Sequence, residues 1–403
     1  MSQLSPDRQH RPADDPIFAL NAEATRRRAA GESIVNATLG TLMDDDGRLL
    51  VLESSVRALH EVPRDEWAAY APIAGLPAFQ RAVIEDCFKG REAFARSATA
   101  TATAGGTGAL RHAVVNFLAP GDAILTTSFF WGPYQTICDE QERRVDTFPM
   151  FDAHGAFDLA ALESGIANHL ELQGRVLLIL NDPCQNPCGY SMTRDEWRGV
   201  AELLARHAAR GPITLLIDMA YYLYGSAADP RAHLDVLEPL LGKIGLLFAW
   251  SASKSFTHYG LRVGAIVACE PDESQRRALT NAFAFSCRGT WSNCNRGGQA
   301  MVTRLLSEPG LARACDAERA AAKELLMGRV RAFNARAIPA GLRYPRYEGG
   351  FFVTVFADEA ESRARHMREA FGVFVVPQKG ALRVALCSVP ERDVPRVVEA
   401  LAD

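Results

Sequence analysis

The sequence lacks long apolar runs, long basic runs and a regularly spaced set of cysteines. No stretch approaches the roughly 20 apolar residues that a membrane-spanning helix needs, and residues 1–15 are polar, without the apolar centre of a signal peptide. The net charge is −4 and the longest basic run is Arg26–Arg28. We therefore expect neither a nucleic-acid nor a membrane partner.

The nine cysteines are an odd number without repeated spacing. We therefore expect no disulfide scaffold. We expect the protein to be in a reducing, cytoplasmic compartment. Cys184 and Cys188 are the one pair with a spacing that could suggest zinc. Their spacing is loose, a second ligand pair is not obvious and Pro187 lies between them, so we expect no metal.

The length of 403 residues suggests two domains in an ordinary globular chain, with 48% apolar and 23% charged residues. Residues 1–15 are expected to form an N-terminal arm. Residues 49–306 are expected to form a large domain, and residues 16–48 together with 307–403 a small one.

Short, nearly continuous apolar runs alternate with helical patterns from about residue 50. This pattern is typical of an α/β fold with a mostly parallel central sheet flanked by helices. The predicted strands are Asp122–Thr127, Arg175–Asn181, Ile213–Asp218 and Gly245–Trp250, with helices such as Thr107–Phe117 and Thr193–Arg210 between them.

The pattern changes after about residue 307 to an α+β arrangement, which we assign to the smaller domain. It begins with one long charged amphipathic helix. The predicted elements are the helix Leu311–Arg336, the strands Gly349–Phe356 and Ala381–Leu386, and a final helix Glu391–Leu401.

Polar residues end three of the predicted strands: Asn181, Asp218 and Ser251. Ligands of open parallel sheets bind in the crevice outside the carboxyl ends of the strands. We therefore expect these three side chains to meet at a ligand site. The alternative is that each of them only caps its strand.

One lysine, Lys254, follows the apolar run Leu246–Trp250 directly. A hydroxyl, Ser251, lies three residues before it, and Arg262 lies eight residues after it. This residue set can hold an aldehyde cofactor as a Schiff base and bind its phosphate.

A second anion-binding signal is Gly105-Gly106-Thr107, at the start of a predicted helix. Glycines let backbone N–H groups approach an anion, and the helix N-terminus adds partial positive charge. The segment lacks the Gly-Lys-Ser/Thr ending of a nucleoside-triphosphate loop and the context of a dinucleotide fingerprint.

Asp218, Tyr221 and Asn186 suit the ring of such a cofactor. A carboxylate keeps a pyridine nitrogen protonated, and we expect a neighbouring cation to lower the pKa of Asp218. The Tyr221 hydroxyl and the Asn186 amide can reach a phenolic oxygen. Alternatively, Asp218 caps a turn and Asn186 belongs to a Pro-Gly turn.

The order and spacing of these motifs resemble the pyridoxal-phosphate-dependent aminotransferases of fold type I, in the class I/II group that includes aspartate and aromatic aminotransferases. The resemblance covers nearly the whole chain. It rests also on the segments Asp15–Leu20, Asn36–Gly40, Asp44–Gly47 and Tyr70–Pro77, and on Arg383.

The resemblance implies roles for single residues. Lys254 would hold the cofactor covalently and move a proton. Its phosphate would lie on Arg262, Ser251, Gly105, Gly106 and Thr107, and Trp131 would stack on its ring. Arg383 would bind the substrate carboxylate. Tyr70 would reach the phosphate of a neighbouring subunit, which implies a homodimer with sites at its interface.

Substrate identity stays open. The resemblance places Phe18 and Thr38 near the substrate and matches Arg288 to an arginine that binds a side-chain carboxylate across the interface. Alternatively, Arg288 is a loop arginine paired with a nearby acid. Thr38 and Cys188 depart from the family pattern, which has glycine and threonine there.

The expected activity is amino-group transfer between an L-amino acid and a 2-oxo acid. The first alternative keeps the cofactor and changes the reaction to elimination, replacement, decarboxylation or carbon–carbon bond formation. A nicotinamide-dependent oxidoreductase fails to explain Lys254, Arg262 and Asp218 together. A non-catalytic regulator would need an added DNA-binding module and a basic helix pair.

Overall fold

The computed structural model describes residues 2–12 and 16–403; residues 1 and 13–15 of the predicted arm lie outside the described residues. The chain divides into two compact units. Unit 1 comprises Met1–Leu49, Gly328–Tyr344 and Phe352–Asp403, and unit 2 comprises Leu50–Met327 and Pro345–Phe351.

Unit 2 is built on a mostly parallel sheet, which confirms the predicted fold class. Its strands are, in spatial order, β2 (Ala98–Ala104), β8 (Val263–Cys269), β7 (Gly245–Ser251), β6 (Ile213–Asp218), β5 (Val176–Asn181), β3 (Ala123–Thr127) and β4 (Arg144–Phe148). Strand β8 runs antiparallel to both of its neighbours, and the ladder from β7 to β4 is parallel.

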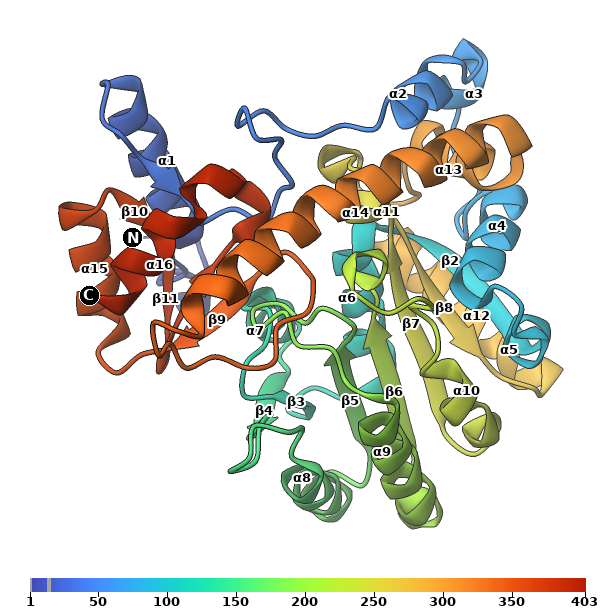
Figure 1. Cartoon of the computed structure of the whole chain (residues 1–403). Helices are drawn as coiled ribbons and strands as arrows, with labels where there is room; N and C mark the ends of the chain where they lie inside the picture. Colours follow the sequence, from blue (N-terminus) through green and yellow to red (C-terminus); the bar gives the residue numbers. More distant parts are fainter. Residues whose placement is uncertain (1, 13–15) are drawn as a thin grey trace. The chain divides into compact units, whose positions relative to one another are not determined.

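Side chains of the central strands alternate between two hydrophobic clusters, one on each face of the sheet, as the two-residue period of a strand requires. Leu178 and Leu180 of β5 pack with α4 (Pro77–Phe88), α8 (Leu159–Leu172) and α9 (Arg194–His207). Leu177 and Ile179 pack with α6 (Gly105–Phe117), α7 (Pro133–Glu140) and α12 (Glu273–Thr290). Figure 1 shows these helices on both sides of the sheet.

The remaining helices of unit 2 are α2 (Glu53–His60), α3 (Arg64–Ala68), α5 (Glu92–Ser97), α10 (Leu234–Leu237), α11 (Ala252–Ser255) and α13 (Arg296–Ser307). Helix α9 begins after Thr193, whose hydroxyl and Glu196 form a reciprocal capping box. It ends at His207, and a 3₁₀ turn continues to Arg210. Helix α6 begins at Gly105, two residues before the predicted start.

Unit 1 contains two small sheets. Strands β11 (Val376–Gln378), β12 (Ala381–Val384) and β9 (Val353–Phe356) form an antiparallel sheet, and β1 (Val35–Asn36) pairs in parallel with β10 (Val373–Phe374). The helices of this unit are α1 (Pro16–Ala29), α15 (Ala360–Ala370) and α16 (Val394–Ala402).

Helix α14 (Pro309–Ala337) matches the predicted long helix within two residues at its start and one at its end. The boundary between the units falls inside it, between Met327 and Gly328, whereas the sequence placed a boundary at residue 307. A continuous helical pattern contains no signal for the point at which its contacts change from one unit to the other.

Two predicted strands are shorter in the structure. The segment from Gly349 turns before β9 starts, because Gly350 has φ +84° and its N–H donates to the Tyr224 carbonyl at 3.0 Å. A Cβ at Gly349 would lie 2.6 Å from the same carbonyl oxygen, so this backbone contact requires glycine. Strand β12 stops at Val384, and a 3₁₀ turn follows at Leu386–Ser388.

Among the described residues, no helix is both long enough and apolar enough to pass through a membrane.

Candidate active site

A cavity of about 570 Å³ lies within unit 2, at the carboxyl ends of β5, β6 and β7. It brings together most of the predicted cofactor residues. It is lined by Gly106, Thr107, Leu110, Trp131, Asn181, Asn186, Asp218, Ala220, Tyr221, Ser251, Ser253, Lys254 and Arg262.

Three neighbouring strands supply the floor of this cavity. Asn181, Asp218 and Ser251 are the last residues of β5, β6 and β7. Asn181 and Asp218 are partners in the strand register, and the Asn181 amide donates to the Asp218 carbonyl at 2.8 Å. The expected meeting of these strand ends is therefore confirmed.

Lys254 enters the cavity from the short helix α11, directly after β7. The Ser251 hydroxyl starts this helix by accepting the Ser253 N–H at 3.2 Å. The Lys254 amine lies 5.2 Å from the centre of the Tyr221 ring. Burial raises the pKa of Asp218, and the nearby Lys254 opposes that rise in part.

Arg262 and the first turn of α6 form an anion-binding corner. Desolvation lowers the pKa of Arg262. Its guanidinium donates to the Tyr259 carbonyl at 2.8 Å and to the Ser253 hydroxyl at 3.4 Å. A Cβ at Gly105 would lie 2.5 Å from Nη2 of Arg262, and the φ of +70° at this residue favours glycine. An exposed arginine beside a helix N-terminus fits a phosphate.

Asp218, Tyr221 and Asn186 form the opposite, buried end of the cavity. The Asn186 amide donates to the Tyr221 hydroxyl at 3.2 Å, and its backbone N–H donates to the Asn181 side chain at 2.7 Å. Burial raises the pKa of Asp218 above its ordinary value. The prediction that the pKa of Asp218 is lowered is therefore wrong for the protein groups alone. Desolvation raises this pKa more than the hydrogen bonds and the charge of Lys254 lower it.

Tyr134 is a site residue that the sequence prediction missed. It is buried, and its hydroxyl donates to Asp218 Oδ2 at 2.8 Å. Its ring lies edge-on to Trp131 at 5.8 Å. The available signal was its position three residues after Trp131, close to one helical turn, at the start of α7. This hydrogen bond opposes the effect of burial on the Asp218 carboxyl.

Replacing Tyr134 with phenylalanine is expected to raise the pKa of Asp218 further. If the reaction requires the carboxylate, the acid limb of the pH profile of kcat/KM moves to higher pH. The loss of one hydrogen bond to a charged group corresponds to a decrease in kcat/KM of about tenfold.

Tyr222→Phe is the matched control, because Tyr222 is also buried and donates to an aspartate, Asp86, outside the cavity. Loss of the Tyr222 hydrogen bond should lower thermal stability without moving the acid limb of the kcat/KM profile. A Tyr134→Phe profile that coincides with the wild-type profile would contradict the assignment.

Three predicted residues of unit 2 do not line the cavity: Gly105, Tyr70 and Arg288. Tyr70 is 86% exposed. Arg288 lies in the last turn of α12, exposed, and donates to the Ser292 hydroxyl at 2.6 Å. Arg288 is therefore part of a helix and not of a loop, and it donates to a hydroxyl and not to an acid.

The predicted substrate residues Phe18, Thr38 and Arg383 belong to unit 1. Phe18 is 64% exposed, whereas Thr38 and Arg383 are buried. The Arg383 guanidinium donates to the Thr38 carbonyl at 2.6 Å and lies 4.7 Å from the centre of the Phe352 ring.

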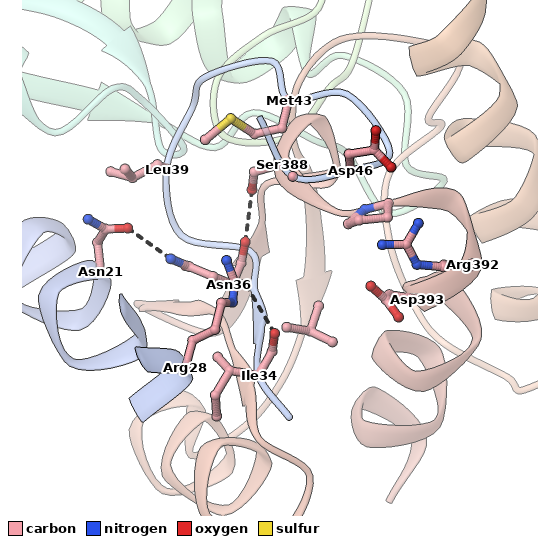
Figure 2. A pocket seen from close by; sticks show the side chains of 13 residues that line it. Asn21, Arg28, Ile34, Asn36, Leu39, Met43, Asp46, Ser388, Arg392 and Asp393 are labelled. Carbon is pink, nitrogen blue, oxygen red and sulfur yellow. Dashed lines mark hydrogen bonds between the residues drawn. The ribbon is translucent and has the colours of Figure 1, made fainter. Parts of the chain in front are cut away.

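Unit 1 has a larger cavity, of about 790 Å³, which Figure 2 shows from close by. Its polar groups are bonded to one another. The Asn36 amide donates to the Asn21 side chain at 2.8 Å, Ser388 donates to the Asn36 carbonyl, and Arg28 donates to the Ile34 carbonyl. Its lining residues include no lysine. The smaller cavity of unit 2 is therefore the candidate active site.

The fold and this lysine-containing cavity define a cofactor-dependent α/β enzyme. Residues 33–401 match the family described as "Aminotransferase class I and II". The chain belongs to this family and is an aminotransferase. The resemblance to the pyridoxal-phosphate-dependent enzymes of fold type I is thereby confirmed, together with the predicted cofactor.

Curated relatives carry the same activity in their names. The chain is 32% identical to an aromatic-amino-acid aminotransferase of Pseudomonas aeruginosa over 53% of its length and 52% of the relative. It is 25% identical to an aromatic-amino-acid aminotransferase of Paracoccus denitrificans over 97% of both chains. An aspartate aminotransferase of Pseudomonas aeruginosa is 28% identical over 74% of both.

Solved structures share the fold. An aminotransferase from Anaerococcus prevotii has a TM-score of 0.93 and 30% identity, with 100% of this chain and 99% of that one covered. An aromatic-amino-acid aminotransferase from Burkholderia pseudomallei, covalently bound to pyridoxal phosphate, has a TM-score of 0.81 and 22% identity over 99% of both.

Proposed function

We propose that Lys254 binds pyridoxal phosphate in the cavity of unit 2 and that the protein moves an amino group between an L-amino acid and a 2-oxo acid. The observation that carries this proposal is the pairing of Lys254 with the anion-binding corner at Arg262 inside one cavity. The bound cofactor supplies an aldehyde that condenses with amines and a ring that withdraws electrons from the neighbouring carbon.

Residues at the two ends of the cavity bind different parts of the cofactor. Arg262, Ser251 and the first turn of α6 hold the phosphate, and Trp131 covers the ring. Asp218 holds the ring nitrogen, while Tyr221 and Asn186 hold the phenolic oxygen. The Lys254 amine would take the proton from the Cα of the amino-acid substrate.

Arg383 is proposed to bind the substrate carboxylate with its two-pronged guanidinium. We propose residues 16–48 and 307–403 as a small domain and residues 49–306 as the cofactor domain. The exposure of Tyr70 and Arg288 supports a homodimer in which both reach the partner's site. We also propose a cytoplasmic location.

For the substrate, we propose that Arg288 pairs with a side-chain carboxylate, so that dicarboxylic amino acids are preferred. The exposed guanidinium at the end of α12 donates to a neutral group, the Ser292 hydroxyl, which a carboxylate can replace. An aspartate aminotransferase among the relatives supports this choice.

The test is a spectral titration of the cofactor-loaded protein with aspartate, glutamate and phenylalanine. We expect each active donor to abolish the visible cofactor band, and a 2-oxo acid to restore it. Arg288→Ala should weaken aspartate and glutamate binding about 30-fold, as expected for the loss of roughly 2 kcal/mol from a charged pair, and leave phenylalanine within about twofold.

Arg277→Ala, an exposed arginine of α12 that pairs with Glu273, is the control for a general effect of lost charge. If no amino acid changes the band, the proposed transfer reaction is contradicted. If Arg288→Ala weakens the binding of all three amino acids equally, the selective role of Arg288 is contradicted. The proposed transfer reaction is not affected by that result.

A further inference from the structure

Lys254 lies on a helix that is too short to hold its own position. Helix α11 has four residues, Ala252–Ser255, and a single helical turn is unstable in isolation because its nucleation fixes several residues for one hydrogen bond. The Ser251 hydroxyl caps its start, and the Phe256 N–H donates to the Ala252 carbonyl at 3.0 Å. The direction of the Lys254 side chain therefore depends on groups outside α11 that fix the main chain.

Tyr224 is the first of these groups. Its hydroxyl donates to the Lys254 carbonyl at 2.9 Å, across 30 positions of the chain, and the tyrosine is buried. The tyrosine is itself held in place, because it ends the 3₁₀ turn Tyr222–Tyr224 and its own carbonyl accepts the Gly350 N–H at 3.0 Å. Its ring lies edge-on to Phe351 at 4.9 Å. A firmly placed phenol thus binds the main chain of the lysine.

Thr257 is the second group. Its N–H donates to the same Lys254 carbonyl at 3.2 Å, and its hydroxyl accepts the Leu52 N–H at 2.9 Å in a buried bond. Its φ of +56° is left-handed, a conformation that is costly for a β-branched residue. Among the described non-glycine residues with positive φ, Thr257 is the only β-branched one. The bond to Leu52, directly before α2, offsets part of that cost.

We propose that Tyr224 and Thr257 are positioning residues for Lys254, which fix its amine at the carboxyl end of β7 for proton transfer. A carbonyl that accepts hydrogen bonds from two separate elements cannot turn away without breaking one of them. A displacement of about 1 Å at a reacting group can cost on the order of 100-fold in rate. This role rests on the proposed function of Lys254, whereas the anchoring of the segment does not.

The test removes one hydroxyl at a time from the full-length protein. Tyr224→Phe should speed amide hydrogen exchange in peptides that cover residues 252–257 by about fivefold, with and without pyridoxal phosphate, as expected for one lost hydrogen bond in a local opening equilibrium. In the cofactor-loaded protein this variant should lower kcat about tenfold and leave KM within about twofold, measured with the most active of aspartate, glutamate and phenylalanine. Lower stability alone would not separate kcat from KM in this way.

Tyr222→Phe is the matched control, because Tyr222 lies in the same 3₁₀ turn but donates to Asp86. It should change neither kcat nor the exchange of residues 252–257. Thr257→Val removes the second hydroxyl and keeps the shape, so it should act like Tyr224→Phe and also speed exchange of the Leu52 N–H. Thr257→Ser retains the hydroxyl and should keep the wild-type exchange rates and kcat.

The outcomes separate anchoring from positioning. Exchange rates in Tyr224→Phe and Thr257→Val that equal those of the wild type would show that the hydroxyls do not hold the segment. Faster exchange with unchanged kcat would show anchoring without any effect on proton transfer, and would also overturn the proposal. A wild-type protein that takes up no cofactor at Lys254 would contradict the proposed function, and the exchange rates would still decide whether the two hydroxyls anchor the segment.

Discussion

Lys254→Ala is expected to abolish covalent retention of the cofactor and to lower kcat by about 10⁴-fold, the upper range for loss of a general acid–base group. The reason is that one amine both binds the aldehyde and moves the substrate proton, and its neighbours offer no replacement. Of the side chains lining the cavity, those of Ser251, Ser253 and Thr107 carry only hydroxyls, and Arg262 stays protonated.

The measurement is mass spectrometry of the protein after borohydride reduction with pyridoxal phosphate. Only five lysines occur in the chain, at positions 89, 243, 254, 323 and 379, so the labelled peptide is unambiguous. Lys243→Ala, at an exposed position, should retain the label. A stoichiometric label that persists in Lys254→Ala would contradict the assignment.

The cofactor cavity was largely predictable because its residues follow strand ends. The short apolar runs identify β5, β6 and β7 within one residue at either end, and a parallel sheet brings the carboxyl ends of neighbouring strands together. In the register Asn181 is the partner of Asp218, and Ser251 lies two residues beyond Ala249, the partner of Asp218 in β7.

What the sequence could not supply are contacts between distant elements. Tyr134 reaches Asp218 across 84 positions of the chain, and an isolated tyrosine in a helix carries no sign of such a partner. The balance of burial against charge at Asp218 also depends on three-dimensional packing, so the direction of its pKa shift was predicted wrongly. His112 and Trp291 meet in the same way, across α6 and α12.

The turn before β9 shows a second reason why the sequence did not predict a strand correctly. Gly349–Phe356 reads as one apolar strand, yet its first part bends because Gly350 adopts a left-handed conformation against the Tyr224 carbonyl. Glycine permits that conformation without requiring it, so the sequence alone left both conformations possible.

Asp218→Asn is expected to lower kcat by about 10²- to 10³-fold, the usual cost of removing one fixed electrostatic group from an active site. The carboxylate is the only acidic side chain among the residues that line the cavity. An amide keeps the size and can accept from one of the two present donors, the Ala220 N–H or the Tyr134 hydroxyl, because it has a single oxygen where the carboxylate has two. It cannot supply the negative charge that holds a proton on the cofactor ring nitrogen.

Asp182→Asn is a demanding control for this prediction. Asp182 is also deeply buried, with a pKa raised to about 7 by desolvation, and it accepts from the Met192 N–H and the Trp197 indole outside the cavity. Asp182→Asn should lower Tm and leave kcat unchanged. Asp218→Asn should lower kcat and leave Tm unchanged. Asp218→Glu, which keeps the charge, should recover part of the activity. Equal kcat values for Asp218→Asn and the wild type would show that the ring nitrogen does not depend on this carboxylate.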